Sequence, residues 1–266
     1  MRSLLIVALA LVLTACETVS TTQPGVVGIE RQQRFIVSGD EVNQAAAAEY
    51  SKVVAAARQK GTLDRDSTLV NRVRSVASRL IAQTGAFRPD APRWAWETHV
   101  IHDNQLNAWA MPGGKIVVYS GLIERLRLSD DELAAIMGHE IAHSLREHAR
   151  ERVSQEMASG LLVGIAGAAL GLGEVGQQLA NTVAEVTFTL PHSRAHETEA
   201  DRLGVELAAR AGFEPHAAIS VWQKMLQASS SGGPQFLSTH PSPETRLADL
   251  KIYADRVAPL YLQARR

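Results

Sequence analysis

The amino-acid sequence predicts an α+β fold, in which a mostly helical body carries a small β-sheet beside its central helix. Two observations support this class. Apolar residues recur at helical spacing over most of the chain, whereas short apolar stretches between residues 94 and 119 alternate as strands do. No repeat and no shift in composition separates a second domain within the 266 residues, of which 45% are hydrophobic.

The predicted strands form one cluster in the first half of the chain. They are expected at residues 94–101, at Trp109 and Ala110, and at residues 115–119, with a turn at Pro112-Gly113-Gly114. Helices flank this cluster on both sides, and glycines close the first two of them. They are expected at residues 41–60, 63–83, around residue 140, and near residues 174–190, 193–211, 215–228 and 243–262.

The N-terminus has the pattern of a bacterial export signal. An almost unbroken apolar run from Ser3 to Leu13 would be a helix of about 18 Å, too short for a hydrocarbon core of about 30 Å. It ends at Leu13-Thr14-Ala15-Cys16, which resembles a lipobox, and Glu17 after the only cysteine favours the outer membrane. We expect a lipoprotein signal peptide at residues 1–15, a lipidated N-terminus at Cys16 with a tether to residue 40, and the folded domain at residues 41–266. An unlipidated signal peptide is the alternative.

The strongest functional signal is His139-Glu140-x-x-His143. Residues four apart lie on one face of a helix, so both imidazoles can bind one Zn²⁺, and Glu140 can take a proton from water at the open position of the metal. Ser129 and Glu132 form a capping-box signal ahead of this motif. The sequence thus predicts one amphipathic helix of about twenty residues that carries most of a zinc site, with Glu140 as the general base.

A catalytic zinc needs a third protein ligand, and a second acidic stretch can supply it. A histidine ligand from the same stretch is excluded, because Arg146 and Ala149 stand where glycine and histidine are needed. Glu197 and Asp201 are four apart on a predicted helix. Glu197 can therefore bind the metal while Asp201 accepts the other ring N–H of a zinc-bound histidine. Arg194 is expected to orient a carboxylate or to contact substrate.

The two motifs, His139-Glu140-x-x-His143 and Ser193-Arg194-x-x-Glu197-x-Glu199-Ala200-Asp201, resemble those of gluzincin zinc metallopeptidases of the CAAX-prenyl-protease and HtpX-like family. The similarity covers about residues 40–256 and is greatest to the periplasmic lipoprotein branch, which is LoiP- and BepA-like. The resemblance implies metalloendopeptidase activity and one Zn²⁺ per chain. It also implies His139, His143 and Glu197 as metal ligands.

The resemblance further implies how the site binds substrate and how it can be kept inactive. Similar peptidases hold the substrate as an added strand on an exposed sheet edge, and Asn107, Ala108, Trp109 and Ala110 are the candidate edge; an ordinary core hairpin is the equal alternative. Related proteins place a histidine at the position of His240 over the zinc as a fourth ligand, which would make the site latent. Two other roles stay open for His240, a donor to the transition state and a plain loop histidine.

These patterns together predict a zinc endopeptidase that is lipid-anchored in the outer membrane of a Gram-negative bacterium and faces the periplasm. It would degrade misfolded or misassembled envelope proteins by attack of zinc-activated water on the peptide bond. The alternative is an outer-membrane protein assembly factor or chaperone with latent protease activity, with the outer-membrane assembly machinery as partner. Nucleic-acid binding is excluded, because the net charge is −1 and no basic stripe is interleaved with aromatic residues.

The remaining unusual residues receive weaker predictions. His192 and His196 are four apart but out of phase with the acidic ligand, so they are expected to be structural or solvated, as is Glu199. His148 has no partner at ligand spacing and receives no role. The uncharged stretch from Ala158 to Gly173 is expected to be a close-packed helix or hairpin over the site, with membrane contact as the alternative.

Overall fold

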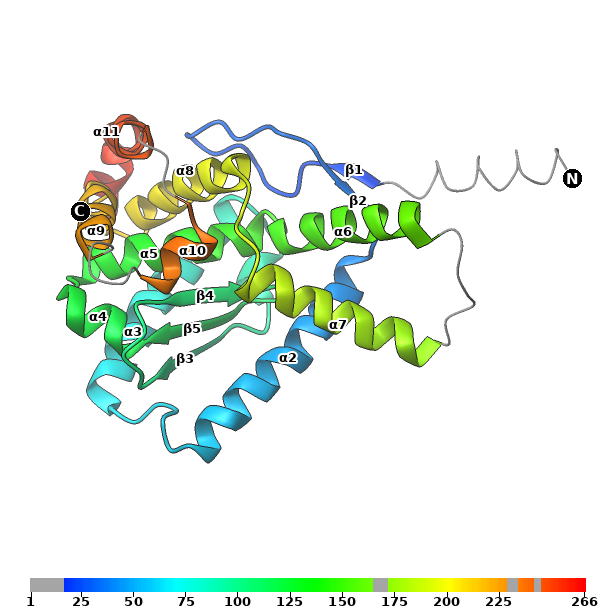
Figure 1. Ribbon diagram of the computed structural model, residues 1–266. Coiled ribbons are helices and arrows are strands. Elements are labelled where there is room, and N and C mark those ends of the chain that lie inside the picture. The colour runs from blue at the N-terminus through cyan, green and yellow to red at the C-terminus, as the bar shows by residue number, and fades with distance from the viewer. Residues whose placement is uncertain (1–16, 165–171, 229–233, 242–244) are drawn as a thin grey trace, which may run out of the picture.

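A three-stranded sheet lies between helices and is buried on both faces (Figure 1). The computed structural model describes residues 17–164, 172–228, 234–241 and 245–266. β3 (Glu97–Ile101) runs parallel to β5 (Lys115–Tyr119), and β4 (Ala108–Met111) pairs antiparallel with the other side of β5. The strand order β3-β5-β4 therefore leaves β4 at an edge of the sheet.

Alternate residues of the strands enter two separate hydrophobic cores. Ile116 and Val118 belong to a core shared with α3 (Ser67–Ile81) and α5 (Asp130–Leu145). Val117, between them, faces a second core that is formed with α2 (Gly39–Gln59), α6 (His148–Gly164) and α7 (Leu172–Phe188). Because both faces of the sheet are covered, β5 is a continuous apolar run rather than a polar-apolar alternation.

Two glycines let the backbones of α5 and α8 (Arg194–Arg210) touch where the helices cross. A Cβ at Gly204 would lie 2.7 Å from the backbone nitrogen of His139, and a Cβ at Gly138 would lie 2.9 Å from the carbonyl oxygen of Gly204. This contact is one residue away from the His139 motif, so it sets the distance between the two helices at the predicted metal site.

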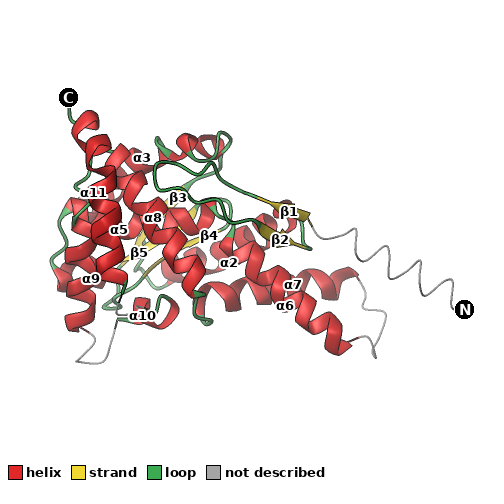
Figure 2. Ribbon diagram, turned by 90° about the horizontal axis from the view of Figure 1, so that it is seen from above, coloured by secondary structure: helices red, strands yellow, loops and turns green. Residues whose placement is uncertain are grey.

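Shorter elements and two long helices complete the body. Figure 2 shows α9 and α11 beside α5 and α8, on the side of the molecule away from α6 and α7. The bounds of these elements are Thr84–Ala86 (η1), Ala91–Arg93 (η2), Ser120–Leu126 (α4), Ala217–Ala228 (α9), Gln235–Thr239 (α10) and Arg246–Ala264 (α11). Within the described residues, no helix combines the length and the apolar character that crossing a membrane requires.

The α+β class and the capped helix are confirmed, but the helix that carries the motif is shorter than predicted. Ser129 and Glu132 form both hydrogen bonds of the capping box at the start of α5. The helix ends at Leu145, since Glu147 adopts a left-handed backbone conformation (φ 49°), and α6 begins at His148. The expected single helix of about twenty residues is thus two helices.

Residues 17–37, which we call the N-terminal arm, are folded against the body, so their prediction as a tether is wrong. β1 (Glu17–Val19) and β2 (Gln33–Phe35) pair antiparallel above α6 (Figure 1), and the side chains of Gln33 and Phe35 are buried. The backbone N–H of Val27 donates to Glu206 of α8 (2.9 Å). Polar residues of the arm have buried partners far along the chain, and hydrophobic periodicity carries no sign of such contacts.

Two predictions fall on parts of the chain outside this description. The signal peptide and Cys16 lie in residues 1–16, and the apolar stretch from Ala158 to Gly173 includes residues 165–171. Both stay predictions.

Candidate metal centre

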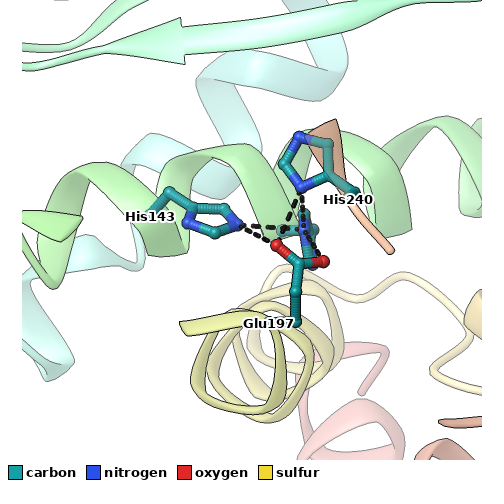
Figure 3. A group of neighbouring side chains, drawn as sticks. His143, Glu197 and His240 are labelled. Atoms are coloured by element: carbon teal, nitrogen blue, oxygen red, sulfur yellow. Dashed lines mark hydrogen bonds and ion pairs between the residues drawn. The ribbon is translucent and has the colours of Figure 1, made fainter. Parts of the chain in front are cut away.

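Four buried side chains converge on one point. His139 and His143 come from α5, Glu197 from the first turn of α8, and His240 from the residue that ends α10. One ligand atom from each lies within 4.8 Å of the others. Figure 3 shows His143, Glu197 and His240 pointing toward one another from these three elements.

The spacing of these atoms fits a tetrahedral zinc ion. Ligands at the usual zinc distances of about 2.0–2.2 Å lie about 3.3 Å from one another. The Nε2 atoms of His139 and His143 are 3.1 Å apart, and Glu197 Oε1 is 3.4 Å from His143 Nε2. His240 Nδ1 lies 3.2 Å from His139 Nε2 and 3.0 Å from Glu197 Oε1. Imidazole nitrogens with a carboxylate are a donor set that zinc prefers.

The protonation of Glu197 and His143 also suits a metal. Burial opposes a charge on Glu197, yet His240 and His139 hold the pKa of its carboxyl well below the usual range. Burial lowers the pKa of the His143 imidazole well below its usual value. A charged carboxylate and a neutral imidazole are the forms that bind a metal ion.

Glu140 faces the cluster with one carboxylate oxygen free of hydrogen bonds to the described residues. Its Oε2 accepts a hydrogen bond from the backbone N–H of Ala110 (3.1 Å), whereas Oε1 is buried without a partner and lies 3.4 Å from His240 Nε2. Burial raises the pKa of the Glu140 carboxyl. A carboxylate with a raised pKa is a better proton acceptor for reactions near neutral pH.

Asp201 and an unpredicted arginine hold His139 and Glu197 in place. Asp201 Oδ1 lies 3.0 Å from His139 Nδ1, so it can accept that ring N–H while Nε2 faces the cluster. Arg246, at the start of α11, donates to Asp201 (2.6 Å) and to Glu197 Oε2 (2.9 Å). The prediction that Arg194 orients a carboxylate is wrong, because its side chain is exposed and has no hydrogen bond or ion pair to a described residue. Substrate contact stays a prediction for Arg194.

His143 is held by a second, longer chain of residues. Its Nδ1 lies 2.9 Å from Nδ1 of His148, and His148 Nε2 lies 3.0 Å from Glu199 Oε2. An unbroken helix would turn His148 about 140° away from His143. The left-handed backbone at Glu147 ends α5 and lets the two rings meet, so sequence spacing alone missed this pair.

Glu199 is buried, so the expectation that it is solvated is wrong. Glu199 does lie on the side of α8 opposite Glu197, but that side is covered by α6 and the N-terminal arm. His196 fits its prediction as a structural histidine, since it is buried and pairs with Glu151 (3.2 Å). His192 is half-buried, and its ring centroid lies 4.1 Å from that of His143.

A cleft opens over the cluster. Glu140, His143 and His240 line it on one side of the edge strand β4, and the end of α7 at residues 186–188 forms the opposite wall. All four residues of the predicted edge, Asn107 to Ala110, line this cleft. The structure thus brings the edge strand and the metal cluster into one open site.

A His-Glu-x-x-His helix, a glutamate from a second helix and a sheet edge beside them define a zinc metallopeptidase of the gluzincin kind. The sequence model described as Peptidase family M48 matches residues 68–254, which is more than half of the chain. The chain belongs to this family.

Named relatives come from mitochondria and from bacteria. The chain is 36% identical over 181 residues to mitochondrial metalloendopeptidase OMA1 of Schizosaccharomyces pombe, covering 67% of this chain and 51% of that protein. It is 30% identical over 222 residues to the beta-barrel assembly-enhancing protease of Escherichia coli strain K12, covering 78% of this chain and 43% of the relative. With OMA1 of Bos taurus it shares 30% identity over 246 residues, 88% of this chain and 46% of the relative. The chain therefore spans about half the length, or less, of the curated relatives it matches.

Proposed function

We propose that this protein is a zinc-dependent endopeptidase of the bacterial cell envelope that degrades misfolded or misassembled envelope proteins. The observation that carries the proposal is the buried Oε1 of Glu140, which has no hydrogen bond to a described residue and lies beside a four-residue zinc-ligand cluster in an open cleft. A structural zinc site would need neither the cleft nor such a carboxylate.

The residues of the site divide the chemistry of peptide hydrolysis among them. Bound zinc supplies the Lewis acid that lowers the pKa of water and polarises a carbonyl. Glu140 accepts the proton of the attacking water and can return it to the leaving amine. Asp201 and Arg246 keep His139 and Glu197 oriented while this proton moves.

The substrate binds as an additional strand beside β4. β4 is paired with β5 on one side only, and its other side borders the cleft. Main-chain hydrogen bonds to an extended peptide read little side-chain information, so an unfolded protein of almost any sequence can be held there. Trp109 of the edge strand packs against Phe188 at the end of α7, with 5.1 Å between the ring centroids, and so connects the strand to the α7 wall of the cleft.

The cell envelope is proposed from the N-terminal sequence. Leu13-Thr14-Ala15-Cys16 resembles a lipobox, and Glu17 favours the outer membrane over the inner one. Cys16 would carry the lipid, and the folded N-terminal arm would hold the catalytic body close to the membrane surface. The LoiP- and BepA-like branch of the family is the one that this location favours.

A second function is favoured by two observations. One relative is named a beta-barrel assembly-enhancing protease, and His240 lies within the ligand cluster, where it can close the site as a fourth ligand. Both fit an outer-membrane protein assembly factor or chaperone whose protease activity is latent.

Cleavage of unfolded casein by purified residues 17–266, with and without a chelator, tests the proposed activity. Glu140→Gln should keep one Zn²⁺ per chain and lose at least about 100-fold in rate, because only the proton acceptor is removed. Loss of zinc from Glu140→Gln, or unchanged cleavage, would show that Glu140 is not the base. Wild-type protein that binds zinc and protects unfolded porin without cutting casein would favour the assembly function.

A further inference from the structure

The N-terminal arm reaches the buried side of the metal centre through one arginine. Arg31 donates from Nη1 and Nη2 to the two oxygens of Glu151 (2.6 and 2.8 Å), and from Nε to Glu199 Oε1 (2.5 Å). Its side chain is 35% exposed, whereas those of Glu151 and Glu199 are 6% and 9% exposed. A forked guanidinium can bridge two carboxylates in this way, which an ammonium group cannot.

The other oxygen of Glu199 connects this contact to a zinc ligand. Glu199 Oε2 lies 3.0 Å from His148 Nε2 and accepts from Arg146 Nε (2.9 Å). His148 Nδ1 in turn lies 2.9 Å from His143 Nδ1. The side chains of Arg146 and His148 are fully buried, so water cannot replace these partners.

The hydrogen bonds that link His143, His148 and Glu199 have a single consistent direction of donation. If His143 binds zinc through Nε2, its ring proton would lie on Nδ1 and would be donated to Nδ1 of His148, 2.9 Å away. His148 then carries its own proton on Nε2 and donates it to Glu199. If Glu199 moves away, only the N–H of His143 still favours this tautomer of His148. The opposite tautomer would point an N–H of His148 at the N–H of His143 and turn the ligand ring.

Arg31 holds Glu199 in position beside a second carboxylate, Glu151. Glu151 and Glu199 share the Arg31 guanidinium, so loss of Arg31 would remove the cation between two buried carboxylates. Oε1 of Glu199 would lose its donor, while Arg146 would still donate to Oε2. The arm adds further contacts around the same point. Gln33 donates to Glu151 (2.7 Å), and the carbonyl of Arg31 accepts from Arg146 (2.9 Å).

We propose that Arg31 is a positioning residue of the zinc site: it holds Glu199, Glu199 sets the tautomer of His148, and His148 orients the ligand His143. The match to the M48 family begins at residue 68, so the arm that supplies Arg31 lies outside the matched region. The N-terminal arm thus helps to position a ligand of the metal centre in this protein. This inference rests on His143 being a zinc ligand, as the proposed function requires.

Zinc affinity of full chains, measured by competition with a chromogenic chelator, tests the proposal. Arg31→Gln should weaken zinc binding about 10- to 100-fold, the loss typical of residues that orient a metal ligand. It should also change the visible absorption spectrum of the Co²⁺-substituted protein, because the ligand ring has moved. The matched control is Arg34→Gln, which removes the same charge from an exposed position on the same arm and should leave both measurements as in the wild type.

Further variants separate positioning from a general loss of folding. Arg31→Lys keeps the charge but not the fork, so its zinc affinity should fall between those of the wild type and Arg31→Gln. If Arg31→Gln does not fold, Arg31→Lys decides alone, and an affinity and Co²⁺ spectrum equal to the wild type would overturn the proposal. Wild-type affinity and spectrum in a folded Arg31→Gln would overturn it as well. Failure of wild-type protein to bind zinc would instead refute the proposed function.

Discussion

Gly204→Ala tests how closely the crossing of α5 and α8 controls the metal site. The added Cβ would lie 2.7 Å from the backbone nitrogen of His139, whereas ordinary contact begins at 3.4 Å. The obstacle is backbone, which cannot rotate aside as a flexible side chain can. The two helices must therefore separate by about 0.7 Å, several times the tolerance of about 0.2 Å that metal-ligand distances allow.

The expected loss of zinc affinity in Gly204→Ala follows from the free-energy cost of overpacking. Inserting a methyl group into a closely packed core costs about 1–3 kcal/mol. Zinc binding must draw Glu197 of α8 back toward His139 and His143 of α5. The strain of this movement therefore lowers the affinity for zinc. At 1.4 kcal/mol for each factor of ten, zinc affinity should fall by about 5- to 150-fold.

Chelator competition measures this affinity, and thermal unfolding of the metal-free protein shows whether folding has suffered as well. Gly176→Ala is the matched control, because Gly176 is an exposed residue of α7 with nothing within 4 Å of the added Cβ. This variant should be neutral, or more stable by up to about 1 kcal/mol. Wild-type zinc affinity together with unchanged thermal stability in Gly204→Ala would refute the reasoning.

Three further predictions address latency, stability and anchoring. His240→Ala should raise casein cleavage or cause self-cleavage with zinc still bound. A fall of about 100-fold in the cleavage rate would instead assign His240 the role of a donor to the transition state, and an unchanged rate would make it a plain loop residue. Glu132→Gln should lower the free energy of unfolding at pH 7 by about 1–2 kcal/mol. Burial opposes the charge on Glu132, but Lys224, Ser129 and Ser220 hold its pKa below the ordinary 4.5. This stabilisation is therefore present above that pH and lost as pH falls through the lower folded value, so denaturant unfolding should show the stabilities of the variant and the wild type converging as pH falls below 4.5. Cys16→Ser should abolish palmitate labelling and recovery in the outer-membrane fraction; unlabelled, freely soluble wild type would contradict the anchor.

Local patterns predicted the parts of the site that local structure determines. The capping box at Ser129 and the four-residue spacings of His139 with His143 and of Glu197 with Asp201 all act within one or two helical turns. The sequence therefore placed these residues on the correct elements, and the fold class followed from the same periodicity.

The residues that sequence analysis missed act across long separations or across a break in a helix. Arg246 contacts Glu197 from 49 residues away, and Arg31 reaches Glu199 across 168 residues. His148 lies only five residues after His143, but the left-handed residue Glu147 turns it back toward the ligand. Glutamate is not a residue that signals such a turn, so a continuous helix was the natural prediction.

The division of the interior by the sheet has a consequence for how the molecule opens. The zinc ligands on α5 and α8 border one core, whereas the wall of the cleft on α7 packs with α2 in the other. Proteins open in cooperative units that follow such packing boundaries. Backbone amides of α2 and α7 should therefore exchange with deuterium as one group, separately from those of α5 and α8. The cleft can then widen to admit a bulky unfolded chain while the ligand helices stay closed around the metal.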